Sequence, residues 1–242
     1  LSDCHLMADP MAQYKGVNPY ARLSALLDQI MTEHGDTDAL LITGDLSQDD
    51  SLESYGLLKQ LLDKTGFSYH WLMGNHDLSR RTINEAFPTI SLAPEHFELR
   101  ARQENNQTWQ ILLLDSRFSG HVEGRLAPQQ MAWLEQRLKT QQESVVFLHH
   151  PVTDTASPEM NAHRLVDADH FAQIVEQNAH LRAIFHGHVH REMHLDLHGT
   201  PVYASPATSY QYQPDFALDQ QPPGYRVISL GDQVHTWVER LD

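Results

Sequence analysis

Five short clusters in the sequence carry side chains that are able to bind metal ions. They are Asp3-x-His5, Gly44-Asp45, Gly74-Asn75-His76-Asp77, His149-His150-Pro151 and His186-Gly187-His188-Val189-His190. Carboxylate, imidazole and amide groups together form a mixed nitrogen and oxygen set. Such a set suits manganese, iron, zinc or cobalt better than copper(I), and suits calcium less well. Because the chain has 17 histidines, the grouping of these residues is more informative than their number.

The number of candidate ligands indicates two metal ions. A single catalytic metal must keep an open coordination position, and seven candidates are too many for it. They fit two ions that share one bridging carboxylate. Two ions about 3.5–4 Å apart can hold a hydroxide and clamp a phosphoryl group during in-line displacement. The seven candidates are Asp3, His5, Asp45, Asn75, His149, His188 and His190.

Each cluster from Gly44 onward follows a run that is typical of a buried strand. The runs are 39–45, 68–73, 145–151 and 181–190. In open α/β sheets, ligands bind beyond the carboxyl ends of the strands. If these strands are parallel, we expect the clusters to gather at one edge.

The remaining segments predict helices between the strands and hairpins towards the C-terminus. Helices are expected from Pro19 onward and over 51–66, 128–141 and 167–178, with caps at Asn18, Ser51 and Gly66. Hairpins are expected over 96–115, 191–205 and 224–241, and a long irregular loop over 209–224. Without any linker or repeat, the pattern predicts one domain, residues 1–242, with mixed sheets and helices outside.

Composition narrows the range of partners. The net charge of −15 argues against long nucleic acids, which need a basic face. It permits a small phosphorylated ligand if bound cations invert the local charge. No run approaches the ~18 apolar residues of a membrane span, and no signal peptide is visible. The single Cys4 cannot form an internal disulfide, so we expect a cytoplasmic protein with Cys4 as a buried thiol. Whether the chain forms a symmetric homodimer is a question that the sequence leaves open.

The ordered motifs D-x-H, G-D, G-N-H-D, H-x-P and G-H-x-H resemble the signature of the calcineurin-like metallophosphoesterase superfamily. Within it, the sequence is most similar to bacterial class III 3′,5′-cyclic-AMP phosphodiesterases. Stretches outside the metal motifs carry this closer likeness, above all LDSRFSGHVEGRL (114–126) and PGYRVISL (223–230). The resemblance implies a mixed α/β fold, a four-layer sandwich of two mixed β-sheets flanked by helices.

The resemblance also implies a division of the ligands between two ions. One ion would take Asp3, His5, Asp45 and His190, and the other Asp45, Asn75, His149 and His188, with Asp45 bridging. Iron and manganese are the expected metals, with zinc, cobalt or magnesium as alternatives. His150 and His186 are expected to line the site without binding metal.

The expected reaction is hydrolysis of a cyclic nucleotide to the 5′-monophosphate by a metal-bridging hydroxide. His76 would act as general acid on O3′, because histidine has a suitable unperturbed pKa. Asp77 would orient His76, or else cap the following segment, and Gly74 would supply the turn. Asn75, His76 and His190 would contact the substrate. Alternative substrates are 2′,3′-cyclic nucleotides and glycerophosphodiesters, and a non-catalytic binding scaffold is a remote alternative.

The start of the sequence departs from the resemblance. Leu1 stands only two residues before Asp3, whereas the superfamily implies a full strand before D-x-H. We therefore expect that residues upstream of Leu1 are missing from this sequence and that the N-terminal strand is truncated. If those residues are truly absent, Asp3 would be poorly anchored and the ion that it binds would be lost more easily.

Overall fold

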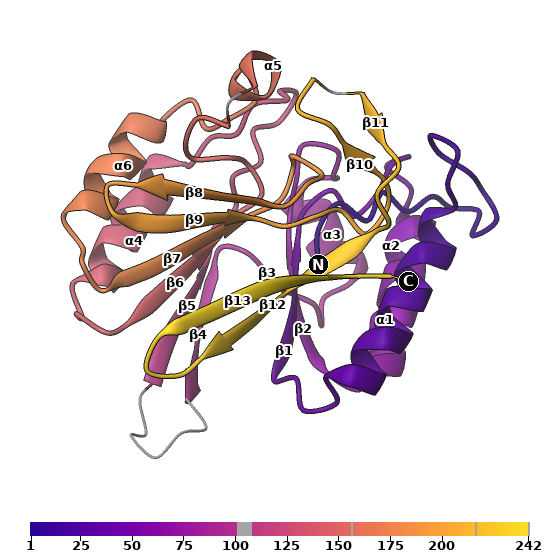
Figure 1. Cartoon of the computed structure of the whole chain (residues 1–242), viewed down its shortest axis with the longest axis horizontal. Coiled ribbons are helices and arrows are strands. Elements are labelled where there is room, and N and C mark those ends of the chain that lie inside the picture. Colours follow the sequence, from indigo (N-terminus) through magenta and orange to yellow (C-terminus); the bar gives the residue numbers. More distant parts are fainter. Residues whose placement is uncertain (101–107, 156, 216, 242) are drawn as a thin grey trace.

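Two β-sheets lie between two pairs of helices in the computed structural model, which describes residues 1–100, 108–155, 157–215 and 217–241 (Figure 1). The smaller sheet is parallel, in the order β1-β2-β3. The larger sheet has the order β4-β5-β6-β7-β9-β8, with parallel central strands and antiparallel edge strands. The strands are β1 (Ala39–Thr43), β2 (Ser68–Leu72), β3 (Ser91–Leu92), β4 (Glu95–Arg100), β5 (Thr108–Leu113), β6 (Ser144–Phe147), β7 (Leu181–His186), β8 (Met193–Leu197) and β9 (Thr200–Ala204).

The helices form the outer layers. α1 (Pro19–Glu33) and α2 (Leu52–Thr65) cover the smaller sheet, and α4 (Pro128–Leu138) and α6 (Ala168–Glu176) cover the larger one. The predicted caps are confirmed: Asn18 and Ser51 accept hydrogen bonds from the first turns of α1 and α2, and Gly66 ends α2 with a φ of 72°. Two short helices, α3 (Arg80–Ala86) and α5 (Pro158–Asn161), lie in connections for which we expected no helix.

Side chains that alternate along the strands build the layers. On β6, Val145 and Phe147 pack between the sheets, whereas Val146 packs towards α4 and α6. On β2, Trp71 faces α1 and α2, and the next residue, Leu72, faces the other sheet. The predicted four-layer mixed α/β fold is therefore confirmed. Of the two sheets, only the larger is mixed, because the three strands of the smaller one are all parallel.

The described residues of the C-terminal part form three hairpins, of which the first, β8 with β9, is the expected pair over 191–205. The expected pair over 224–241 is present as β12 (Gly224–Leu230) and β13 (Val234–Arg240). The segment 209–224 is less irregular than expected, because β10 (Gln211–Tyr212) pairs with β11 (Leu218–Asp219). The expected hairpin over 96–115 is β4 with β5, although residues 101–107 at its tip lie outside the described residues.

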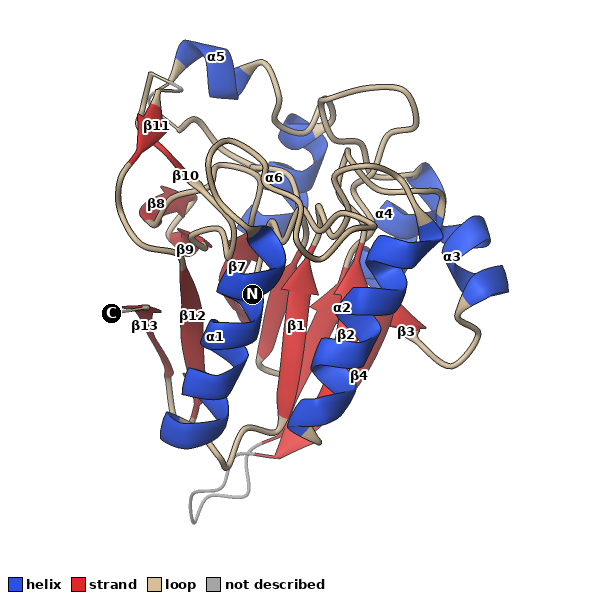
Figure 2. Ribbon diagram, turned by 90° about the vertical axis from the view of Figure 1, so that its right-hand side faces the viewer, coloured by secondary structure: helices blue, strands red, loops and turns tan. Residues whose placement is uncertain are grey.

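The carboxyl ends of β1, β2, β6 and β7 point to the same side of the molecule, where loops, α5 and β10–β11 cover them (Figure 2). Residues 1–6 run alongside the end of β1, since Asp3, His5 and Leu6 donate backbone hydrogen bonds to residues 44–46. This arrangement brings the D-x-H cluster to the same edge as the others. In the part of the chain that the structure describes, no helix is both long and apolar enough to cross a membrane.

Candidate metal centre

The strand ends bring the predicted ligands together in two adjacent groups. In the first group, the ligand atoms of Asp3, His5, Asp45 and His190 all lie within 4.8 Å of one another. The second contains His149, His150 and His188 under the same distance limit. Asn75 lies beside the second group, with Oδ1 3.2 Å from His149 Nε2. All seven expected ligands thus meet at one edge.

Asp45 lies between the two groups. Its Oδ1 is 3.4 Å from His149 Nε2, and its Oδ2 is 3.7 Å from His5 Nε2. One carboxylate oxygen therefore faces each group, which is the arrangement that a bridging ligand requires. The side chain of Asp45 is buried, and the backbone N–H of His76 donates to Oδ1 at 2.9 Å.

Backbone carbonyls select the ring tautomers of two histidines. His149 Nδ1 donates to the Thr43 carbonyl at 2.8 Å, and His190 Nδ1 donates to the Tyr210 carbonyl at 2.9 Å. Each neutral ring then has a lone pair on Nε2, the atom that faces the other candidate ligands. His190 Nε2 lies 3.1 Å from His5 Nε2 and 3.4 Å from Asp3 Oδ1. Acceptor atoms this close repel one another unless protons or cations lie between them, so the donor set fits metal ions.

The pKa values of His5 and His188 agree with rings that act as neutral ligands, whereas that of His149 shows the effect of the neighbouring Asp45 carboxylate. Burial lowers the pKa of His5 to about 3 and holds the pKa of His188 well below its usual range. For His149, burial lowers the pKa but the Asp45 carboxylate outweighs it and raises the value to about 9. With no cation bound, a proton on His149 therefore neutralises part of the negative charge of Asp45.

Strained backbone accompanies the ligands. Five of the seven expected ligands have a left-handed φ, which is uncommon for residues other than glycine: Asp3 (54°), His5 (47°), Asp45 (51°), His188 (68°) and His190 (50°). Such strain persists only when the surrounding structure enforces it, and it tends to occur at functional sites. Sharp turns here aim consecutive side chains into one small volume.

Two glycines serve this packing, and a side chain on either one would collide with His149. Gly44 has a φ of 93°, so it is conformationally required before Asp45. Gly74 does not have a left-handed φ. A side chain on it would collide with Asp45 and His149. Gly74 is therefore needed for space as well as for the turn, which the Asp77 N–H closes by donating to the Gly74 carbonyl at 3.3 Å.

Asp3 is firmly held, contrary to the expected weak anchoring. Its backbone N–H donates to the Gly44 carbonyl at 3.0 Å, and its carboxylate accepts from Ser2 Oγ at 2.5 Å and from the His188 N–H at 3.1 Å. Its carbonyl accepts from Ser209 Oγ at 2.6 Å. Hydrogen bonds from four sides therefore fix the first ligand.

His76 is exposed, and its ring meets the His5 ring edge-on at 5.1 Å between centroids. It lies beside the first group while its side chain remains accessible to a substrate. Asp77 does not have the expected orienting position. Its buried carboxylate accepts from the backbone N–H groups of Leu46, Ser47 and Gly74 and from the Tyr55 hydroxyl at 2.8–3.2 Å. It therefore joins the turns after β1 and β2, which is closer to the alternative capping role.

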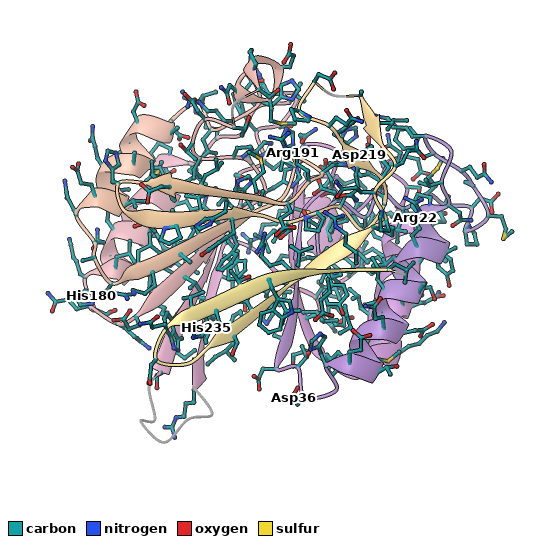
Figure 3. The ribbon with its side chains drawn as sticks, in the orientation of Figure 1. Arg22, Asp36, His180, Arg191, Asp219 and His235 are labelled. Atoms are coloured by element: carbon teal, nitrogen blue, oxygen red, sulfur yellow. The ribbon has the colours of Figure 1, made fainter. Side chains whose placement is uncertain are left out.

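Three other side chains lie near the second group, and of these only His150 was expected to line the site. His150 belongs to the group by distance, and its Nδ1 lies 2.8 Å from Ser116 Oγ, which also accepts from the backbone of His149 and His150. His163 places its ring 5.5 Å from that of His188. The doubled histidine in HHP was a usable signal, whereas nothing in the sequence pointed to Ser116. Other histidines, such as His180 and His235, lie far from this edge (Figure 3).

Comparison with known proteins agrees with this geometry. A family model described as calcineurin-like phosphoesterase matches residues 1–192. The chain is 35% identical to the 3′,5′-cyclic adenosine monophosphate phosphodiesterase CpdA of Vibrio vulnificus, over 100% of this chain and 88% of that protein. It is 30% identical to the protein of the same name from Escherichia coli K12, over 95% of this chain and 83% of the relative. A dimetal phosphatase from Danio rerio shares the fold, with a TM-score of 0.69, 14% identity and coverage of 98% and 96%.

Proposed function

This chain belongs to the calcineurin-like phosphoesterase family, and we propose that it hydrolyses 3′,5′-cyclic AMP to the 5′-monophosphate at a centre of two metal ions. The relatives named as cyclic-AMP phosphodiesterases support this substrate class. The reaction releases O3′ of the ribose from phosphorus while water supplies the new oxygen. The proposal includes iron or manganese as the metals. The unpaired, buried Cys4 supports a reducing cytoplasmic location.

The position of Asp45 is the observation that carries the proposal. One carboxylate with an oxygen towards each ligand group supports two ions held close together. We infer that Asp3, His5, Asp45 and His190 hold one ion. Asp45, Asn75, His149 and His188 hold the other. Two ions in such a site supply a hydroxide-like nucleophile at neutral pH and neutralise the charge that develops on the phosphoryl group.

His76 would protonate the leaving oxygen. Its exposed ring beside His5 supports contact with a phosphodiester bound at the ligand groups. A proton donor within reach lowers the barrier because O3′ is a poor leaving group as an alkoxide. Asn75 and His190 flank the same position and would help to orient the diester.

Metal-stripped protein reloaded with manganese or iron tests the proposal. We expect the reloaded protein to convert 3′,5′-cyclic AMP to 5′-AMP, at least tenfold faster than it converts 2′,3′-cyclic AMP or glycerophosphocholine. His149→Ala should abolish the activity, whereas His235→Ala, an exposed histidine on the C-terminal hairpin, should retain it. Faster turnover of either alternative substrate would contradict the substrate assignment. Full activity without metal would contradict the mechanism.

A further inference from the structure

Three tyrosines and a lysine gather against one side of the metal-ligand groups. We call Tyr14, Lys15, Tyr210 and Tyr212 the tyrosine–lysine cluster. The Lys15 ammonium lies 4.6 Å from the ring centroids of both Tyr210 and Tyr212 and 5.5 Å from that of Tyr14. It also donates a hydrogen bond to the Tyr212 hydroxyl. The cluster therefore combines aromatic faces with a cationic donor.

The cluster is in contact with two expected ligands of the first ion. The Tyr210 ring lies 4.5 Å from the His190 ring and 5.3 Å from the His5 ring. Tyr212 lies 5.1 Å from His190, and Tyr14 is stacked on His5 at 6.4 Å. A phosphodiester bound at the ligand groups would thus have aromatic rings beside it.

A strained turn holds Lys15 in this place. Tyr14 and Val17 exchange two backbone hydrogen bonds, and the turn between them places Lys15 at a φ of 51° and Gly16 at 79°. A lysine in the left-handed region costs roughly 1 kcal/mol, which local backbone preference alone would not select. The contacts of the ammonium group with the three tyrosines explain why a lysine occupies this position.

Backbone hydrogen bonds hold Tyr210 and Tyr212 against His190 of the first ligand group. Tyr210 accepts from His190 Nδ1 through its carbonyl, and the Tyr212 N–H donates to the His190 carbonyl at 3.1 Å. Arg22 of α1 donates to the Ser209 carbonyl at 2.5 Å, and Figure 3 shows Arg22 at the start of that helix. Tyr210 is only 5% exposed, whereas Tyr14 and Tyr212 are partly exposed and Lys15 is exposed. Tyr14, Lys15 and Tyr212 are therefore accessible to a ligand, and they rest on the buried ring of Tyr210.

We propose that the tyrosine–lysine cluster receives the purine base of the substrate, with Tyr14 and Tyr212 as stacking faces and Lys15 as donor to N7. This inference rests on the proposed function, which places the cyclic phosphate at the ligand groups. The planar base must then lie beside the phosphate. Aromatic side chains bind bases through stacking worth about 1–3 kcal/mol per base.

This chemistry predicts a definite selectivity. Stacking favours the larger purine surface over a pyrimidine. N7 is an acceptor in both adenine and guanine, so the Lys15 ammonium does not discriminate between them. The cluster therefore selects cyclic purine nucleotides over cyclic CMP and distinguishes weakly between cyclic AMP and cyclic GMP.

The test compares substrates with and without a base on the manganese-loaded full chain. Its measure is the ratio of kcat/KM for 3′,5′-cyclic AMP to kcat/KM for the same cyclic phosphate on a ribose without a base. Tyr212→Leu should lower this ratio roughly 5- to 150-fold, mainly through KM for cyclic AMP. Lys15→Gly suits the left-handed turn and should lower it roughly 10- to 150-fold by loss of one charged hydrogen bond.

Two controls separate the base contact from general damage. Tyr212→Phe keeps the ring and should stay within about threefold of the wild-type ratio. Gln141→Gly also relieves a left-handed φ, of 56°, on the α4–β6 connection and should leave the ratio unchanged. Equal losses on both substrates in Tyr212→Leu, or an unchanged ratio, overturn the inference while the proposed function stands. A wild-type protein that hydrolyses neither substrate overturns both.

Discussion

Asn75 and His76 are neighbours in one turn, yet their side chains serve different surroundings. Asn75 Oδ1 lies 3.2 Å from His149 Nε2, among the candidate ligands, whereas the His76 ring is exposed and packs edge-on against His5. Truncating each side chain should therefore affect the protein differently, one through kcat and the other through metal content. His76→Ala should keep two metal ions per chain and lower kcat by about 10²–10⁴-fold, the range that general acid catalysis contributes.

Asn75→Ala should instead lose metal from the second site, with activity returning in part at high metal concentration. Metal analysis after gel filtration, together with kcat measured over a metal titration, distinguishes the two variants. Full activity of His76→Ala would refute its role as general acid. A metal content of two ions in Asn75→Ala would remove Asn75 from the ligand set.

The predicted ligands and the observed groups agree because short motifs at strand ends determine both. Asp77 shows where such reasoning stops. The sequence places it next to His76, but its carboxylate turns away to accept hydrogen bonds from the turn after β1, which is some 30 residues distant. The tyrosine–lysine cluster was only partly foreseeable. The sequence places Tyr210 and Tyr212 in one loop that could stack a base, whereas Tyr14 meets Tyr210 only through tertiary packing.

At the scale of elements, Asp77 joins the turn after β1 to the turn after β2. Asp77→Ala would leave three backbone N–H groups and the Tyr55 hydroxyl without this acceptor in a buried site. We expect a loss of about 3 kcal/mol or more in the free energy of unfolding, since buried unsatisfied donors are costly. Tyr55→Phe removes one of these donors, and with it the acceptor of the Leu78 N–H, and should cost less, about 1–2 kcal/mol.

Urea unfolding of the metal-stripped proteins measures both losses without a contribution from bound ions. Glu85→Ala is a suitable control, because the Arg81–Glu85 ion pair on α3 is exposed and contributes about 0–0.5 kcal/mol. A smaller loss in Asp77→Ala than in Tyr55→Phe would show that the carboxylate does not tie the turns together.

The long elements were predictable and the short ones were not. α1 and α2 carry both an apolar stripe and side-chain caps, and β6 and β7 are apolar runs buried on both faces. By contrast, β3, β10 and β11 have two residues each and α5 has four. Segments this short show no periodicity, and contacts with the rest of the fold decide their conformation.

At the scale of the whole molecule, the ligand groups lie where the two sheets meet. β1 and β2 of the smaller sheet supply Asp45 and Asn75 from the turns that follow them. β6 and β7 of the larger sheet are followed by His149, His188 and His190. Bound ions would link the two sheets. They would bind only the folded state, because the ligands come together only there. Each site at a free metal concentration of about 100 Kd stabilises the fold by about 2.7 kcal/mol. For a chain of this size, two ions correspond to a rise in Tm of about 10–20 °C.

This rise should depend on pH through His149. Without metal, the folded pKa of His149 is raised to about 9, above the 6.5 of an ordinary histidine. Its protonation therefore stabilises the metal-free fold below pH 6.5, and that stabilisation is lost as the pH rises through 9. In the loaded protein the ring would be deprotonated and bound to metal, so this loss would not occur. Calorimetry of manganese-loaded and chelator-treated protein should show a difference in Tm that widens between pH 6.5 and 9.

In His149→Ala the difference should be smaller and should not widen, whereas His235→Ala should behave as wild type. A difference in Tm that narrows over this range in the wild type would exclude competition between the proton on His149 and the metal.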